Sequence, residues 1–365
     1  MKAILIGDNI TSLVLAKCLV NNNINVNLYS EPNLHKIDKI RTISISKKNL
    51  SFIQNSILKV DNKYLWNINN IEIYQEYKDV KKILDFKDND KNLFSIIKNY
   101  TFYNLLNNQL KNNKKFKKFI IHKKKDDFFE NLKNKKNYLI FNCDKNNKIS
   151  DKYSSNSIKK NNLGKAYVAS VKHEKIQNNI ACQIFTRLGP IAFLPTSDST
   201  TSVVFSITKK NDFSNKKIIE LINFYNRKYK ILSISELKNF HLKLSLQSKY
   251  VYNNILQFGD AIHQIHPLAG QGFNMTLRDI EEINKLIIEK KSLGLRIDSE
   301  IFKKFEKRVK HKNIVFASGI DFINFYFSKK SLVELKFSEK FFKIINNNKA
   351  INKMVIKFAD TGLSL

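Results

Sequence analysis

The sequence predicts an α/β fold in which a doubly wound parallel sheet is joined to an antiparallel β-sheet and a helical C-terminus. Three observations lead to this prediction. A strand–turn–helix–strand unit opens the chain over residues 2–29. Residues 166–207 contain several apolar runs of strand length with turn residues between them. A strand–turn–helix pattern returns at Ile255, and the rest of the chain has mainly helical periodicity.

The elements follow in order. Residues 2–6 form a short apolar strand, residues 13–20 repeat apolar side chains at helical spacing, and residues 26–29 form a second strand. The middle of the chain predicts a helix at 50–58, short strands and turns at 64–85, a helix at 99–110, a solvated segment at 107–118, buried strands at 119–122 and 138–142, and an exposed connection at 144–162. A helix at 215–229 and a strand at 239–247 complete the antiparallel region.

These elements predict two discontinuous domains, because a single core stops growing at about 250–300 residues and the chain has 365. The parallel-sheet domain takes residues 1–75, 100–163 and 250–330. The antiparallel domain takes residues 76–99 and 164–249, and a C-terminal helical segment takes 331–365.

Composition excludes several classes of protein. Hydrophobic residues make up 42% of the chain, which excludes global disorder. The formal charge is +32, but the lysines are spread along the whole chain, so we expect no nucleic-acid partner and leave open an acidic membrane surface. Three separate cysteines without a CxxC pair indicate a reducing compartment. Without an apolar run of about 18 residues, the expected location is cytoplasmic, with peripheral attachment to the inner face of the membrane.

The first strand ends in a turn with the spacing of a dinucleotide-binding motif. Residues 7–12 read GDNITS, so Gly7 keeps the first glycine while Asn9 and Ser12 replace the second and third. Glu31, after the second strand, is the candidate acidic residue for an adenosine ribose. An ordinary βα turn and an ordinary surface charge remain alternatives for these two features.

A more specific motif occupies residues 258–279, which read FGDAIHQIHPLAGQGFNMTLRD. Asp260 ends a strand, where its carboxylate can accept hydrogen bonds from a polyol. A helix then begins near Gly270 and Gly272, so free backbone amides and the positive end of the helix dipole meet at one place. This combination favours an anionic ligand with a planar ring lying against the backbone.

The 258–279 segment resembles the second FAD-binding motif of the class A flavin monooxygenases, the GR2 or para-hydroxybenzoate hydroxylase type. More narrowly, it resembles the ubiquinone-biosynthesis hydroxylases. Other stretches are similar to that family in the same order: 41–46 (RTISIS), 97–99 (IKN), 171–174, 181–185, 189–195 (GPIAFLP) and 321–327. The resemblance implies that the parallel-sheet domain binds FAD and that the antiparallel sheet belongs to a substrate domain.

The resemblance also implies a set of cofactor-binding residues. The implied residues are Gly7, Asn9, Ser12, Glu31, Arg41, Asp144, Gly259, Asp260, Pro267, Gly270, Gln271, Gly272 and Asn274. Among them, the Gly7 turn would hold the ADP part of FAD, Arg41 would lie by the phosphates or flavin, and Asp260 would bind the ribityl chain.

The implied reaction hydroxylates the aromatic ring of a polyprenylated phenol in ubiquinone biosynthesis, through a flavin C4a-hydroperoxide. FAD is the implied cofactor, NAD(P)H or a reductase partner the electron donor, and O₂ the co-substrate. No protein side chain is assigned a catalytic role, although His263 and His266 are expected to pack near the flavin or the substrate cavity. The implied partners are the polyprenylated phenol, a membrane surface and other ubiquinone-biosynthesis proteins.

Two departures from the family support an alternative. The family's middle Asp-Gly motif corresponds to Asp144-Lys145, and the first turn lacks two glycines. The chain could therefore be a flavin-poor, non-catalytic partner in a quinone-biosynthesis assembly. Asp260, His263 and His266 also have a D-x-x-H-x-x-H spacing, but they lie in a loop with no further ligand nearby, so no metal is expected. The aromatic stretch 316–327 is expected to be core or to line an exit for an apolar tail.

Overall fold

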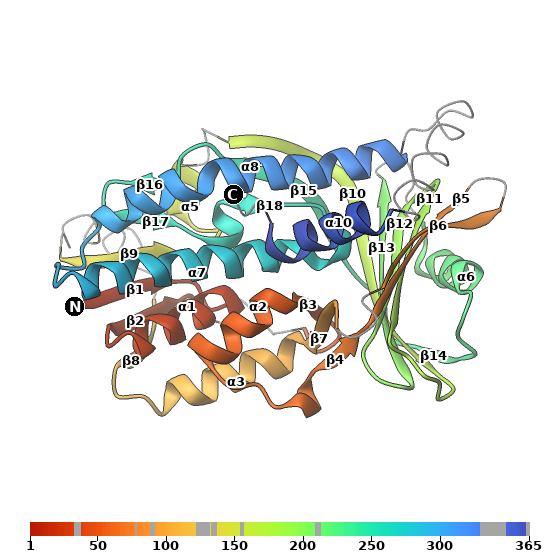
Figure 1. Cartoon of the computed structure of the whole chain (residues 1–365), viewed down its shortest axis with the longest axis horizontal. Helices are drawn as coiled ribbons and strands as arrows, with labels where there is room; N and C mark the ends of the chain where they lie inside the picture. Colours follow the sequence, from red (N-terminus) through yellow and green to blue (C-terminus); the bar gives the residue numbers. More distant parts are fainter. Residues whose placement is uncertain are drawn as a thin grey trace.

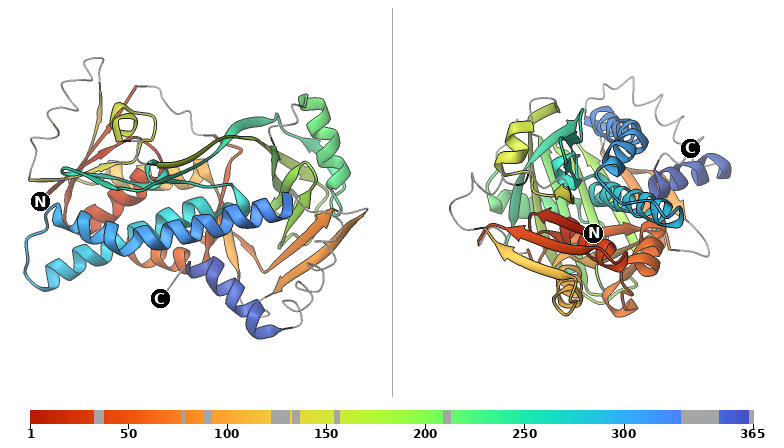
Figure 2. Two further views of the ribbon diagram at one scale, coloured as in Figure 1. Left: turned by 90° about the horizontal axis from the view of Figure 1, so that it is seen from above. Right: turned by 90° about the vertical axis from the view of Figure 1, so that its left-hand side faces the viewer.

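The computed structural model describes residues 1–32, 38–76, 79–87, 92–121, 132, 137–153, 157–208, 213–328 and 348–362. A parallel sheet with its helices lies at one end of the elongated molecule, and a large antiparallel sheet lies at the other (Figure 1). The long helices α7 (Gln271–Ser292) and α8 (Glu300–Ser328) run side by side between these two ends (Figure 2). Sites that depend on both sheets can therefore form beside α7.

In the described residues the first sheet has six strands in the order β16-β17-β9-β1-β2-β8. All neighbouring pairs are parallel except the β16–β17 hairpin. The bounds are β1 Lys2–Ile6, β2 Asn25–Ser30, β8 Phe116–Ile120, β9 Tyr138–Asn142, β16 Val251–Tyr252 and β17 Ile255–Gln257. The carboxyl ends of β1, β9 and β17 thus lie next to one another, which is where open α/β sheets bind their ligands.

Helices α1 (Ile10–Asn21), α3 (Asn99–Lys111) and α7 share a hydrophobic core with this sheet. Leu13, Leu15 and Leu19 of α1 are fully buried. Helix α1 is apolar on most sides because it packs on the sheet, on α3 and on α7. The strand–turn–helix–strand unit predicted at the start of the chain is confirmed.

The large sheet has nine strands in the described residues. Its main path is β18-β15-β10-β13-β12-β11-β5-β6, and β14 pairs with β10. The bounds are β5 Asn70–Glu76, β6 Val80–Lys87, β10 Ser157–His173, β11 Ile180–Thr186, β12 Gly189–Pro195, β13 Thr200–Thr208, β14 Ile231–Ile234, β15 Lys238–Gln247 and β18 His263–Gln264. Helix α6 (Asn215–Tyr225) covers one face, and the predicted antiparallel region is present.

A small sheet joins the two halves. In it, β7 (Phe94–Lys98) pairs with β3 (Thr42–Ser46) and β4 (Trp66–Ile68). The domain division therefore differs locally from the sequence prediction. Strand β5 already belongs to the large sheet from Asn70, because it pairs with β11, whereas β7 returns to β3. Strand β10 crosses the predicted boundary at 163 because it is 17 residues long.

Two local predictions were wrong. The predicted buried strand at 119–122 is instead the edge strand β8, and only Phe116 of its five residues is buried. Apolar residues on an edge strand look like core residues in the sequence. The predicted exposed connection at 144–162 contains α5 (Lys148–Tyr153) and the start of β10. His122 and residues 331–347 of the predicted C-terminal segment lie outside the described residues.

The remaining helices lie around this frame. Helix α2 (Lys47–Phe52) continues into a π-helical turn over Ile53–Ile57, which together match the predicted helix at 50–58. Helix α10 (Lys349–Thr361) lies against α2. Of the helices in the described residues, none combines the length and the apolar character needed to cross a membrane.

Candidate cofactor site and active site

Three segments that are far apart in the sequence meet at the carboxyl edge of the parallel sheet. Gly7 has φ +103°, and a Cβ atom there would lie 2.9 Å from the Cβ of Asp144. A Cβ atom on Gly259 would lie 2.7 Å from the Cγ2 of Thr11, in the first turn of α1. The first βα turn, the Asp144 segment and the Gly259-Asp260 motif are therefore packed directly on one another.

The first turn of α1 is closed by its own side chains. The Oδ1 of Asn9 accepts a hydrogen bond from the Ser12 amide at 3.0 Å, and the Oγ of Ser12 accepts one from the Asn9 amide at 3.0 Å. This capping box satisfies two backbone donors. The Nδ2 of Asn9 also donates to the carbonyl of Cys143 at 2.9 Å. The side chain that replaces the second glycine thus holds α1 to the end of β9.

The capping box leaves the amides of Ile10 and Thr11 as the first-turn donors that helix geometry does not satisfy. Asp8 lies beside them, but its charge is already paired. Its carboxylate accepts hydrogen bonds from Lys118 at 2.5 Å and from the Tyr103 hydroxyl at 2.8 Å. Burial and this neighbouring carboxylate raise the pKa of Tyr103 above its ordinary value. The N-terminus of α1 therefore keeps two donors for an anion.

Asp260 lies at the open side of the site. Its side chain is 63% exposed, so its carboxylate can reach a ligand. The Nζ of Lys145 lies 3.9 Å from its Oδ2. Lys145 occupies the position where the family has the glycine of its middle motif, so this chain adds a positive charge beside Asp260.

The N-terminus of α7 has no side-chain cap, whereas that of α1 is closed by a capping box. Gly270 is the N-cap, in the left-handed conformation at φ 65° and ψ 22°, and no side chain caps the helix. A Cβ atom at Gly270 would lie 2.9 Å from the Cβ of Ser44. The buried Oε1 of Gln271 has no hydrogen-bond partner in the described residues. Uncapped amides and an unpartnered acceptor at one helix end are the features of a ligand site.

Asn274, another of the implied cofactor-binding residues, makes buried contacts within the protein. Its side chain is buried and holds β3 and α2 against α7. It accepts hydrogen bonds from the Ser46 amide and from Asn49, each at 2.9 Å, and donates to the carbonyl of Ser44 at 2.9 Å. These contacts use its amide fully, so Asn274 positions the 41–46 segment beside the α7 N-terminus.

The two histidines of the 258–279 motif are both buried. The Nε2 of His263 lies 2.8 Å from the Oδ2 of Asp279, and the Nδ2 of Asn313 donates to the same carboxylate at 3.0 Å. This buried trio joins β18, α7 and α8. His266 is also buried, and desolvation lowers its pKa to about 4 despite the opposing charge of Asp321. His266 is therefore neutral at ordinary pH.

An apolar cluster borders the site on the side of the large sheet. It consists of Phe185, Leu244, Leu246, Leu268, Met275, Phe316, Ala317 and Ile320. The Phe185 ring stacks on Phe327 with 3.8 Å between centroids. Part of the aromatic stretch 316–327 is therefore core, whereas Phe322 is 65% exposed. An apolar wall beside the α7 N-terminus keeps water from one side of the site.

The comparisons with known proteins agree with this geometry. Residues 161–291 match the family model described as "FAD binding domain". The 3-demethoxyubiquinol 3-hydroxylase of Escherichia coli is 29% identical over 175 residues, which cover 46% of this chain and 44% of that protein. The mitochondrial ubiquinone biosynthesis monooxygenase COQ6 of Dictyostelium discoideum is 24% identical over 212 residues, which cover 48% and 43% of the two chains. The chain thus spans less than half the length of these relatives.

Solved structures show the same fold. The p-nitrophenol 4-monooxygenase PnpA of Pseudomonas putida superposes with a TM-score of 0.76 at 10% identity, over 100% of both chains. The chain therefore has the fold of this monooxygenase. HpxO of Klebsiella pneumoniae, solved with FAD and uric acid, gives a TM-score of 0.71 at 10% identity over 100% of this chain and 97% of that one. The predicted fold class is confirmed.

The residues at this site fit FAD better at one end than at the other. The α7 N-terminus offers uncapped amides and the unpartnered Gln271 oxygen for the flavin ring. The α1 N-terminus offers the amides of Ile10 and Thr11 for the diphosphate, while Asn9 occupies the space that a second glycine would leave open. The site therefore fits FAD, with fewer donors for its ADP half than an intact glycine motif would give.

The remaining predicted residues lie around the same edge. Glu31 directly follows β2, and Arg41 is an exposed residue that precedes β3. Pro267 precedes the short 3₁₀ turn over Leu268–Gly270 that leads into α7. Within the described residues, no three His, Cys, Asp or Glu side chains are grouped to hold a metal ion.

Sequence reasoning missed two contacts in the site. One is the buried pairing of His263 with Asp279, and the other is the pairing of Asp8 with Lys118 and Tyr103. The Arg-Asp pair that ends the 258–279 motif was the available signal for the first, because a buried carboxylate on a core helix needs a partner. The second had no local signal.

Proposed function

We propose that this chain is an FAD-dependent monooxygenase that hydroxylates the aromatic ring of a polyprenylated phenol in ubiquinone biosynthesis. The observation that carries the proposal is the uncapped α7 N-terminus at Gly270, which lies beside the carboxyl edge of the parallel sheet and the apolar cluster of the large sheet. The ubiquinone hydroxylases among its relatives support the choice of substrate class.

The proposed roles of the residues follow from their positions. The amides at the start of α7 and the helix dipole would stabilise negative charge on the flavin ring. Asp260 would accept hydrogen bonds from the ribityl hydroxyls, with Lys145 beside it. Asn274, which is used fully by β3 and α2, would keep the 41–46 segment against the ring. His263 and His266 would act by positioning the loop, because both are buried.

Bound FAD would supply the activation of O₂, with electrons from NAD(P)H or from a reductase partner. The protein would hold the phenol ring against the flavin and exclude water from the reaction. Excluding water requires apolar side chains around the reacting groups. Phe185, Leu246 and Met275 of the apolar cluster would supply some of them.

The proposed setting is the cytoplasm, at the inner face of the membrane, where a polyprenyl tail would be found. The +32 formal charge favours an acidic lipid surface. Other ubiquinone-biosynthesis proteins are the proposed protein partners.

A second candidate function has an observation of its own in its favour. The Asn9 capping box and Lys145 replace the backbone space that two glycines would give to the cofactor. A flavin-poor, non-catalytic partner in a quinone-biosynthesis assembly would tolerate both changes.

One experiment separates the two candidates. The purified protein is incubated with excess FAD, passed through a desalting column and examined by visible absorption, and NADH or NADPH is then added without oxygen. We expect bound flavin that bleaches, and a hydroxylated product by mass spectrometry when O₂ and a short-chain prenylphenol are admitted. Bound flavin that bleaches only with an added reductase identifies the electron donor. Absence of bound flavin contradicts the monooxygenase and supports the non-catalytic partner.

A further inference from the structure

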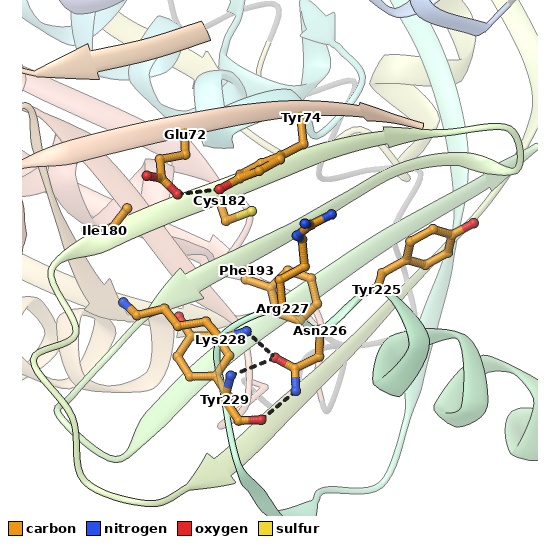
Figure 3. A pocket seen from close by; sticks show the side chains of 10 residues that line it. All are labelled: Glu72, Tyr74, Ile180, Cys182, Phe193, Tyr225, Asn226, Arg227, Lys228 and Tyr229. Atoms are coloured by element: carbon orange, nitrogen blue, oxygen red, sulfur yellow. Dashed lines mark hydrogen bonds between the residues drawn. The ribbon is translucent and has the colours of Figure 1, made fainter. Parts of the chain in front are cut away.

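A cavity lies on the face of the large sheet that α6 covers. It has a volume of about 250 Å³ and lies between β5, β11 and β12 and the segment that follows α6 (Figure 3). Its lining residues from the sheet are Glu72, Tyr74, Ile180, Cys182 and Phe193. The others are Tyr225, the last residue of α6, and Asn226, Arg227, Lys228 and Tyr229 of the segment that follows. Small-molecule sites usually measure about 300–1,000 Å³, so this cavity suits a ligand with a single ring.

The wall of the cavity is aromatic and apolar. Phe193 pairs with Cys182 across β12 and β11, and Tyr229 is buried beside them with 6.2 Å between its ring and that of Phe193. The Tyr229 hydroxyl is already used, because it donates to the Oδ1 of Asn178 at 3.0 Å. One side of the Tyr229 ring packs on His173, with 4.3 Å between ring centroids. The rest of the Tyr229 ring and the Phe193 ring can contact a flat apolar body.

The single carboxylate that lines the cavity is already paired. Glu72 accepts a hydrogen bond from Lys82 at 2.6 Å. It accepts another from the Tyr74 hydroxyl at 2.8 Å (Figure 3). These two bonds use both of its oxygens. Glu72 therefore forms its ion pair with Lys82 and none with Arg227 or Lys228 among the described residues.

Two cations at the rim have no carboxylate partner in the described residues. The guanidinium of Arg227 lies over the Tyr74 ring at 5.4 Å and donates to the carbonyl of Val80 at 2.8 Å. The ammonium of Lys228 lies over the Tyr229 ring at 5.5 Å and has one long hydrogen bond, 3.4 Å, to Asn178. Partial burial lowers the pKa of Lys228, although the nearby charge of Glu72 acts in the opposite direction.

We propose that this cavity is a binding site for a small aromatic carboxylate. The carboxylate would lie between Arg227 and Lys228, and the ring would pack against Phe193 and Tyr229. Arginine presents a planar fork of donors that matches a carboxylate, and each new charge-assisted hydrogen bond would be stronger than a neutral one.

The site is separate from the proposed flavin site. Residues of β11 alternate between the two faces of the sheet: Ile184 packs under α6, whereas Phe185 belongs to the apolar cluster beside α7. Cys182 lies on the same face as Ile184. Binding to the cavity therefore requires neither bound FAD nor hydroxylase activity, and it can be tested whether or not the proposed function holds.

Cys182 provides a natural reporter for this site. Cys18 and Cys143, the other cysteines of the chain, are fully buried, whereas Cys182 is partly exposed in the cavity. Burial raises the pKa of Cys182 to about 12, so its reaction with N-ethylmaleimide is slow enough to follow by mass spectrometry at pH 8.5. The reaction rate is measured on the full chain with benzoate, with its neutral analogue benzamide, and with acetate, at constant ionic strength.

We expect saturable protection by benzoate of at least fivefold, with little protection by benzamide or acetate. Lys228→Gln and Arg227→Gln should each weaken the benzoate effect about tenfold in apparent affinity. Lys216→Gln, which removes an exposed charge from α6 outside the cavity, should not change it. Circular dichroism melting curves establish that each variant is folded.

Three results would overturn the proposal. A weak ligand has a dissociation constant of about 1 mM. The first result is that benzoate gives no protection even at concentrations up to about 20-fold above this value. The second is equal protection by benzamide, which would mean that charge is not recognised. The third is full benzoate protection in both cation variants.

Discussion

At the scale of single residues, Asn9 is the side chain that most distinguishes this cofactor site. It occupies the position of the second glycine in the first turn and satisfies the Ser12 amide itself. In other dinucleotide sites that part of the turn is left to the diphosphate. The Asn9 side chain therefore stabilises α1, but it also occupies the Ser12 amide that the FAD diphosphate would otherwise use.

We predict that Asn9→Gly tightens FAD binding by about tenfold, because one further hydrogen bond to a charged group contributes about 1.5 kcal/mol or more. The loss of the cap should cost only a few tenths of a kcal/mol, since glycine is itself a tolerated N-cap. The loss of the hydrogen bond to the Cys143 carbonyl should cost about 1 kcal/mol more. The measurement is the dissociation constant of FAD from the quenching of flavin fluorescence. Asn9→Asp is the matched control: it keeps the cap but places a negative charge beside the diphosphate, so FAD should bind more weakly than to the wild type. Unchanged or weaker binding by Asn9→Gly would contradict this account.

Gly270 and Gly272 form a natural pair for a second prediction. Gly270 has φ +65°, and a Cβ atom there would lie 2.9 Å from Ser44, whereas the nearest atom to a Cβ at Gly272 is 3.7 Å away. Gly270→Ala should lower the free energy of unfolding by about 1–2 kcal/mol. Gly272→Ala should leave it unchanged or raise it by up to about 1 kcal/mol. Urea denaturation of both variants measures this difference, and equal effects would contradict the assigned conformation of Gly270.

The residues that sequence reasoning could predict are those whose role lies in the local backbone. The 258–279 motif indicated the helix start at Gly270 and a strand just before it, because glycine spacing and strand–turn–helix order are local properties. The strand itself ends at Gln257, and Asp260 lies in the short 3₁₀ turn that follows. The clamp made by Asn274 could not be predicted, since it depends on the 41–46 segment more than two hundred residues earlier. The same holds for Lys118, which reaches Asp8 from a neighbouring strand.

At the scale of elements, the loop between β18 and α7 has a built-in sensitivity to acid. The unfolded chain binds a proton at His266 with the ordinary pKa of 6.5, whereas burial holds the folded pKa near 4. Between these two values the unfolded state binds more protons, so stability falls as the pH falls. The contribution of His266 is fully present above pH 6.5 and is lost by pH 4.

We therefore predict that His266→Gln makes the free energy of unfolding less dependent on pH between 6.5 and 4. The slope removed should be at most about 1.4 kcal/mol per pH unit. His241→Gln, which changes an exposed histidine of β15, serves as the control and should keep the wild-type slope. Urea denaturation at pH 7, 5.5 and 4.5 gives the three profiles. Identical slopes for wild type and His266→Gln would show that burial does not depress protonation there.

Helices and strands could be predicted from the sequence where the spacing of their apolar residues reflects burial of one face. The opening βαβ unit and the antiparallel strands were found because their apolar spacing is strong. Strand β8 was misread as buried because edge strands here carry Phe119 and Ile120, which are 39% and 54% exposed. The domain boundary near residue 70 was also missed, since the pairing of β5 with β11 joins residues more than one hundred positions apart.

At the scale of the whole molecule, the protein combines a large positive charge with exposed apolar side chains on two of its helices. The formal charge is +32. Phe322 and Ile323 of α8 are 65% and 43% exposed, and Met354 of α10 is 74% exposed. The two helices are in contact through Phe316 and Phe358, whose ring centroids lie 5.2 Å apart. An acidic bilayer attracts basic proteins and accepts aromatic side chains at its interface. This combination suits a protein whose proposed substrate carries a polyprenyl tail.

The resulting prediction is binding to vesicles that contain phosphatidylglycerol, weakened by salt, with little binding to pure phosphatidylcholine vesicles. Charge alone would also give this result, so the contribution of α8 needs its own test. Phe322→Ser should weaken binding several-fold, because a phenylalanine side chain transferred from water contributes about 1.5–3 kcal/mol when fully buried and less at an interface. Phe224→Ser, on α6 and 71% exposed, removes an equally exposed ring from another part of the surface and should have no effect. Co-sedimentation at 50 and 300 mM salt measures all three proteins. If both variants bind like the wild type, the attraction is electrostatic and α8 does not enter the interface. If both are weakened equally, aromatic content rather than position determines the binding.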